Sequence, residues 1–193
     1  MERIIIFEDI MEALISMFFL LKSRRTDTKY ILVKCDYNHN CQNTDADSTK
    51  EKIKHELNKA ARKRAVTLND ENIEYGYAAT PEDLECISDF TSNDIFLLDV
   101  SLFDGMDGKG NKEFNEYSSV RFAKELETEY DIPSNRIRFY TRDTSTTDIH
   151  DFTRLTDGKW KVPVLRPANL DGIGNEEAAE MFISKLLSDL EDK

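Results

Sequence analysis

Acidic residues follow two of the apolar runs in this chain. Residues 94–98 read Asp-Ile-Phe-Leu-Leu and are followed by Asp99. The run at 3–7 is followed by Glu8 and Asp9. Short apolar runs of this kind are typical of buried strands, and ligands bind at the carboxyl ends of strands in open parallel sheets. Carboxylates that meet there repel one another unless a cation lies between them, and their hard oxygen atoms suit Mg²⁺, so the pattern predicts a Mg²⁺ site.

A hydroxyl group and a cationic group follow two later runs. Thr141 comes after the run 136–140, and Arg166 comes after the run 160–165. Such groups can hold the oxygen atoms of a phosphoryl group. Each residue alone would only mark the end of a strand. Together with the acids, they predict a metal-dependent site that handles phosphoryl groups.

The elements that must position these residues alternate between strand and helix. The expected strands cover 3–7, 29–34, 72–78, 94–99, 136–140 and 160–165, and the expected helices cover 10–22, 49–64, 80–89, 113–130, 144–155 and 176–190. This alternation predicts an α/β fold with a doubly wound, five-stranded parallel sheet. We expect a single domain over 1–193, in which the segment at about 23–71 is an insertion carrying an extra strand and helix.

Composition narrows the possible partners and the compartment. The 193 residues carry a net charge of −12, which argues against direct nucleic-acid binding because phosphate backbones need a basic surface. Three cysteines suggest no disulfide framework and favour a reducing cytoplasm. The apolar run 10–21 is too short to cross a membrane and is interrupted by Glu12 and Ser16.

The motifs resemble the receiver domain of two-component response regulators, of the chemotaxis-regulator kind. The residues that carry the resemblance are Ile-Ile-Phe-Glu8-Asp9, Phe-Leu-Leu-Asp99 with Gly105-Met-Asp-Gly108 downstream, Phe-Tyr-Thr141, and Leu-Arg166-Pro167. The resemblance covers 1–22 and about 72–193. It implies a flavodoxin-like fold with strand order 2-1-3-4-5.

The resemblance also implies roles for single residues. Asp99 would accept a phosphoryl group from a phosphohistidine on a histidine kinase or a phosphotransfer protein. Asp9 and Asp99 would bind Mg²⁺ with the main-chain carbonyl of Ser101, and Glu8 would act directly or through water. Thr141 would hydrogen-bond the phosphoryl group.

Three further residues can be compared with the family pattern: one departs from it, and two lie at positions of known importance in relatives. Arg166 stands where the family has lysine, and arginine is longer and planar, so the exchange is not conservative. Ser101 and Asp143 occupy positions that tune dephosphorylation in relatives.

The sequence therefore allows three alternative functions. The first is a receiver domain phosphorylated on Asp99 that signals through a downstream protein. The second is a pseudo-receiver, an interaction module without regulated phosphorylation, which Arg166 favours. The third is a Mg²⁺-dependent phosphatase of the haloacid-dehalogenase type, but that class has a second Asp two residues after the nucleophile, where this chain has Ser101.

The segment 23–71 and the first helix raise further possibilities. Residues 50–64 hold seven basic and two acidic side chains, which indicates a solvated basic helix or a docking surface for an acidic partner. Cys35, His39 and Cys41 are a weak match to a zinc site, and a loop with incidental thiols is the simpler interpretation.

Helix 10–22 has apolar residues off its main apolar stripe. They predict that a second element of this chain covers the helix, or that it contacts a partner chain, as in a homodimer. These residues are Met11, Ile15 and Phe19. Two residues elsewhere are expected to have ordinary roles: His150 as an exposed helical residue and Cys86 as a core residue of its helix.

Overall fold

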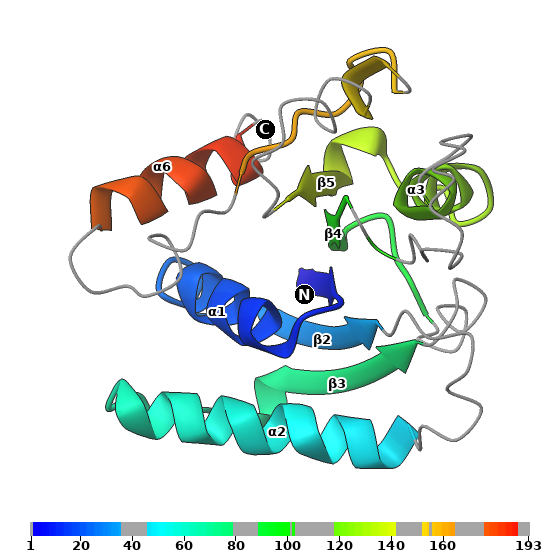
Figure 1. The fold of residues 1–193 in the computed structure, drawn as a ribbon. Coiled ribbons are helices and arrows are strands. Elements are labelled where there is room, and N and C mark those ends of the chain that lie inside the picture. The colour runs from blue at the N-terminus through cyan, green and yellow to red at the C-terminus, as the bar shows by residue number, and fades with distance from the viewer. Residues whose placement is uncertain are drawn as a thin grey trace, which may run out of the picture.

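Five parallel strands form one sheet that has helices on both faces (Figure 1). The computed structural model describes residues 2–35, 46–78, 89–100, 102, 118–141, 152–154, 156–164 and 176–188. In chain order, the elements are β1 (Arg3–Glu8), α1 (Met11–Lys22), β2 (Lys29–Cys35), α2 (Ala46–Lys63), η1 (Asp70–Asn72), β3 (Ile73–Ala78), β4 (Ile95–Asp99), α3 (Ser118–Thr128), η3 (Ser134–Arg136), β5 (Ile137–Tyr140) and α6 (Glu176–Leu187). The predicted α/β class and the five-stranded parallel sheet are confirmed.

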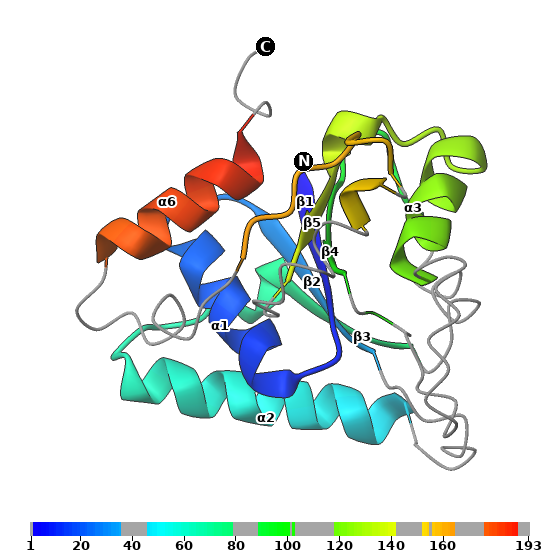
Figure 2. The same ribbon diagram turned by 45° about the horizontal axis from the view of Figure 1, so that its top comes forward.

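The helices divide the interior into two cores. Helices α1, α2 and α6 cover one face of the sheet, and α3 covers the other, as both ribbon views show (Figures 1 and 2). We call these the α1 face and the α3 face. Alternate residues of β1 belong to different cores. Ile4 and Ile6 pack on the α1 face, while Ile5 and Phe7 pack on the α3 face. A strand buried on both faces explains why β1 is continuously apolar.

The strand order differs from the predicted 2-1-3-4-5 on one side of β1 and at the last strand, whereas the neighbours β1, β4 and β5 lie in the predicted order. The sheet runs β3-β2-β1-β4-β5, so β2, expected to belong to an insertion, pairs directly with β1. Strand β3, expected beside β1, lies at the edge of the sheet. The sequences of the two strands explain the exchange. Residues 30–33 of β2 are all apolar and buried, as an interior strand requires, whereas β3 contains the exposed Glu74 and a glycine, which an edge position tolerates.

Within the described residues, the last predicted strand, 160–165, contributes one isolated bridge, which joins Val164 to Thr141. The Thr141 N–H donates to the carbonyl of Pro163 at 3.2 Å. Proline has no N–H to contribute to a ladder, which limits pairing at this point. Trp160, expected on this strand, packs in the core of the α3 face.

Other elements agree with the expected ones to within a few residues. Helix α2 begins at Ala46, three residues earlier than predicted, and α6 ends at Leu187, three residues earlier. The described part of α3 starts at Ser118, and 152–154 form a helical turn. Residues 80–88 of the helix predicted at 80–89 lie outside the described residues, as does most of the helix at 144–155.

A second element does cover α1. Ile15 is 6% exposed, and Met11 and Phe19 are partly buried against the core of the α1 face. Helices α2 and α6 both contact α1, which accounts for its apolar residues off the main stripe. Helix α2 buries only Thr49, Ile53, Leu57 and Ala61 and exposes most of its basic side chains to solvent. None of the helices in the described part of the chain is long and apolar enough to cross a bilayer.

Ion pairs hold the amino edge of the sheet. The buried carboxylate of Asp94 accepts hydrogen bonds from Arg3 Nε at 2.9 Å, from Arg3 Nη2 at 2.5 Å and from the Thr91 N–H at 2.8 Å. The Glu2 carboxylate accepts from Arg25 at 2.7 Å and from Arg136 at 2.8 Å. These contacts join the starts of β1, β2, β4 and β5.

We expect Asp94→Ala to lower the free energy of unfolding by about 3 kcal/mol, because it leaves a mostly buried guanidinium without its carboxylate. The measurement is urea-induced unfolding followed by circular dichroism. Glu180→Gln is the control, since its pair with Arg24 is half-exposed, and it should stay within about 0.5 kcal/mol of the wild type. Equal unfolding midpoints for the two variants would contradict this role of Asp94.

Candidate metal and phosphoryl site

The carboxyl ends of three neighbouring strands lie in one row. The register pairs Phe7 of β1 with Leu98 of β4, and it pairs Asp99 of β4 with Tyr140 of β5. Glu8, Asp99 and Tyr140 are therefore neighbours across the edge of the sheet. Side chains alternate along each strand, so all three continue the series that points to the α1 face.

The three predicted acids come together at this edge. Carboxylate oxygen atoms of Glu8, Asp9 and Asp99 all lie within 4.8 Å of one another. Glu8 is 0% exposed and Asp99 is 3% exposed, while Asp9 is half-buried. The site also lies where the order of the sheet reverses, since the chain moves outward from β1 to β2 and β3 on one side and from β4 to β5 on the other. Ligands bind at such switch points in open α/β sheets.

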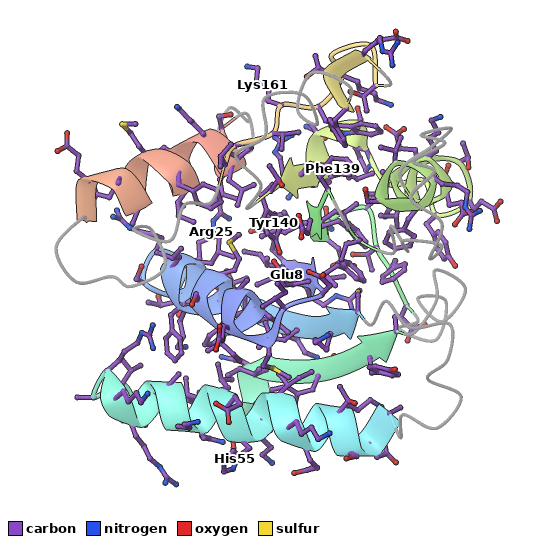
Figure 3. All side chains as sticks on the ribbon, viewed as in Figure 1. Glu8, Arg25, His55, Phe139, Tyr140 and Lys161 are labelled. Atoms are coloured by element: carbon purple, nitrogen blue, oxygen red, sulfur yellow. The ribbon has the colours of Figure 1, made fainter. Side chains whose placement is uncertain are left out.

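The Glu8 side chain is held from two directions. Its Oε1 accepts a hydrogen bond from the Ile10 N–H at 3.1 Å, and its Oε2 accepts one from the Tyr140 hydroxyl at 3.0 Å. Tyr140 belongs to β5 and Glu8 to β1, so the tyrosine side chain spans the width of β4 to reach the carboxylate. Figure 3 shows the two side chains side by side in the interior.

The environment keeps the Tyr140 hydroxyl protonated. Complete burial raises its pKa well above the ordinary value, and the negative charges of Glu8 and Asp99 add to the effect. A protonated phenol can donate to a carboxylate, whereas a phenolate would repel it. Tyr140 is therefore a fixed hydrogen-bond donor at the acidic cluster.

Backbone contacts position the chain where it leaves Asp99. The Val100 N–H donates to the Tyr140 carbonyl at 2.9 Å, and the Val100 carbonyl accepts from the buried Ser119 hydroxyl at 2.7 Å. A turn bond of 3.3 Å joins the Leu102 N–H to the Asp99 carbonyl. The start of α3 thus supports the strand end that carries Asp99.

The structure places only some of the predicted site residues. Thr141 is 3% exposed and lies at the end of β5, next to Tyr140. Several residues with predicted roles lie outside the described residues: Ser101, Asp143, Arg166, the loop from Gly105 to Gly108, His39, Cys41, Cys86 and His150.

Cys35 belongs to the core and not to a metal-binding loop. It ends β2, is 1% exposed and packs on the α3 face. Burial raises the pKa of its thiol well above the ordinary value, and the charges of Glu8 and Asp9 raise it further, while Lys34 opposes them. The described residues therefore support a structural cysteine near the acidic cluster.

Tyr140 and Ser119 are not among the predicted site residues. Tyr140 lies within the apolar run before Thr141, and nothing local shows that a tyrosine on β5 reaches β1. A serine in the first turn of a helix is common and carried no signal. A shallow groove between α1 and α2, lined by Met11, Ser48, Glu51, Lys52, His55 and Glu56, also went unpredicted; it does not include the acidic cluster. His55 projects from the outer side of α2 (Figure 3).

We expect the folded protein to shield Cys35 from alkylation. In a Cys41→Ser/Cys86→Ser protein, iodoacetamide at pH 8 should label Cys35 at least about 100-fold more slowly than in urea, since reaction needs an exposed thiolate. Intact-mass spectrometry follows the labelling. The unfolded thiol ionises at lower pH than the folded one, so the free energy of unfolding should also fall as the pH rises above roughly 8.5. Equal labelling rates with and without urea would contradict the burial of the thiol.

Comparisons with known proteins leave the family open. No protein-family model matches the chain, and no curated protein matches it. A solved structure described as a yeast Spc42 trimeric coiled coil (amino acids 181–211) fused to another structure is similar over 98% of this chain and 89% of its own, with 16% identity and a TM-score of 0.34. At that TM-score, the similarity supports no conclusion about fold or function.

Proposed function

We propose that this chain is a Mg²⁺-dependent phosphoacceptor domain that is phosphorylated on Asp99 and signals through protein contacts. The observation that carries the proposal is the convergence of Glu8, Asp9 and Asp99, with their carboxylate oxygens within 4.8 Å, at the switch point of the sheet. Like charges so close together, two of them buried, are stabilised by a bound cation.

The donor set fits Mg²⁺. Three carboxylates from two neighbouring strand ends offer hard oxygen atoms and no soft ligand, which matches the preference of this ion. Glu8, Asp9 and Asp99 would hold it, with the Ser101 carbonyl as a further candidate. When bound, Mg²⁺ would neutralise charge on the acids and on the oxygen atoms of an incoming phosphoryl group.

In the proposed reaction, this chain supplies the nucleophile. A carboxylate oxygen of Asp99 would form a bond to phosphorus while the bond from phosphorus to the donor breaks, which gives an acyl phosphate and releases the donor group. Glu8 would stay fixed by Tyr140 and by the Ile10 N–H. Thr141 and Arg166 would bind phosphoryl oxygens, as the resemblance to receiver domains implies.

The observed sheet is compatible with this proposal. When the edge strand β3 is set aside, the order β2-β1-β4-β5 corresponds to the 2-1-3-4 part of the receiver order. The isolated bridge at Val164 lies where the fifth strand of such a sheet would pair. On this interpretation, the addition to the receiver pattern is β3, and β2 takes the second position.

The proposal includes partners of defined chemistry. A phosphohistidine on a histidine kinase or phosphotransfer protein would be the donor, and a downstream protein would be the output. The reducing cytoplasm expected from the composition would suit such a relay.

A pseudo-receiver is the second candidate. The observation in its favour is that Asp99 is only 3% exposed, so a donor would need the site to open. A protein of this kind would keep the fold and the contacts without being phosphorylated.

We expect the protein to gain one labile phosphoryl group when incubated with acetyl phosphate and Mg²⁺, as measured by intact-mass spectrometry. Asp99→Asn should abolish the adduct, since the amide is a poor nucleophile, and chelation of Mg²⁺ should reduce it strongly. Asp131→Asn is a matched control, because Asp131 is exposed at a left-handed backbone position that asparagine also accepts (φ 54°).

The possible results separate the candidates. Absence of an adduct despite Mg²⁺ binding favours the pseudo-receiver, and an adduct that persists in Asp99→Asn rejects Asp99 as the acceptor. Continuous hydrolysis of added phosphomonoesters would instead indicate a phosphatase.

A further inference from the structure

Tyr140 makes a contact that no local pattern requires. Its side chain is 0% exposed, and its hydroxyl lies 3.0 Å from Glu8 Oε2 and 3.2 Å from the Phe7 carbonyl oxygen. A hydroxyl has a single proton to donate, and a bond to an ionised carboxylate is stronger than one to a neutral carbonyl. A phenylalanine could fill the same space, so the hydroxyl adds an interaction with Glu8 to the packing of the ring.

Hydrogen bonds from Ile10 and Tyr140 hold different oxygen atoms of Glu8. Oε1 accepts from the Ile10 N–H at 3.1 Å, and Oε2 accepts from Tyr140. One donor comes from the backbone just after β1 and the other from two strands away, so rotation of the carboxylate would break at least one bond. Glu8 is fully buried, and water cannot replace the lost partner at low cost.

A carboxylate that is held in one orientation should favour Mg²⁺ binding over Ca²⁺ binding. Mg²⁺ demands near-ideal octahedral geometry with short bonds, and it gains from ligands that are already in place. Ca²⁺ takes more ligands, tolerates irregular geometry and often binds both oxygens of one carboxylate. A Glu8 side chain whose two oxygens are already engaged cannot easily turn both toward a single ion.

We propose that Tyr140 is a positioning residue that makes the acidic site select Mg²⁺ over Ca²⁺ by holding Glu8 in one orientation. The inference rests on the metal-binding part of the proposed function. Partners that orient the ligands of a metal site typically change affinity by roughly 10–100-fold when removed.

Isothermal titration calorimetry with MgCl₂ and with CaCl₂ tests this on the full chain. Tyr140→Phe should weaken Mg²⁺ binding by roughly 10–100-fold and weaken Ca²⁺ binding less, so the ratio of the two affinities falls. Thermal unfolding without metal shows whether each variant is folded at the titration temperature.

Two other tyrosines supply matched controls. The Tyr75 hydroxyl is buried and has no hydrogen-bond partner among the described residues, so Tyr75→Phe should leave both affinities unchanged. The Tyr30 hydroxyl donates to the Arg25 carbonyl at 2.9 Å, far down the strand from the acids. Tyr30→Phe should reduce stability without changing the affinity ratio.

A second variant keeps the test decisive if Tyr140→Phe folds poorly. Glu8→Asp keeps the carboxylate but shortens it by one methylene group, which moves it away from the Tyr140 hydroxyl. It should lower the affinity ratio in the same direction, and an unchanged ratio in this variant would overturn the orientation of Glu8 as the source of selectivity. Where Tyr140→Phe does fold, the double variant should lose little more than either single variant, as expected for two partners of one interaction.

The failures can be told apart. An unchanged affinity ratio in Tyr140→Phe, or an equal change in Tyr30→Phe, overturns the role of Tyr140. Wild-type protein that binds neither ion overturns the metal site and this inference together. Wild-type protein that binds Mg²⁺ selectively but takes no phosphoryl group from acetyl phosphate overturns only the phosphoacceptor proposal.

Discussion

The parallel pairing of β1 with β4 is the constraint on which the site depends. Its register places Phe7 opposite Leu98, so the next residues, Glu8 and Asp99, leave the sheet at the same level. A shift of one residue would turn one of the two carboxylates to the opposite face of the sheet. Helices pack on both faces of the two strands, so such a shift would force both apolar cores to repack around exchanged side chains.

Acidic groups have different partners at the amino ends and at the carboxyl ends of the strands. At the amino edge, Asp94 and Glu2 are matched by arginines, and these pairs join four strands. At the carboxyl edge, three acids face one another, and hydrogen bonds from Tyr140 and the Ile10 N–H hold one of them. Gathered like charges oppose folding, and natural proteins accept such local costs mainly at functional sites. The contrast separates the part of the sheet that stabilises the fold from the part that can do chemistry.

The acidic cluster lies at the ends of β1 and β4, away from the edge strand β3 of the sheet. Strand β3 extends the sheet at an outer edge, where β2 is its neighbour in the sheet, and helix α2 packs against both strands. The row formed by Glu8, Asp99 and Tyr140 depends only on β1, β4 and β5. A doubly wound sheet can therefore acquire an edge strand and an exposed basic helix without disturbing its switch point.

The class of the fold, most of the boundaries of the described elements and the three acids of the candidate site can be predicted from the sequence alone. These features are local: an apolar run of strand length, a helical stripe and the residue type at a strand end can all be seen in neighbouring positions. The pairing of β2 with β1 and the contact from Tyr140 to Glu8 across β4 are visible only in the folded chain. Backbone hydrogen bonds do not select the neighbours of a strand, because any parallel strand can offer them. The contact between Tyr140 and Glu8 depends on the order of β1, β4 and β5, which no single segment of the sequence encodes.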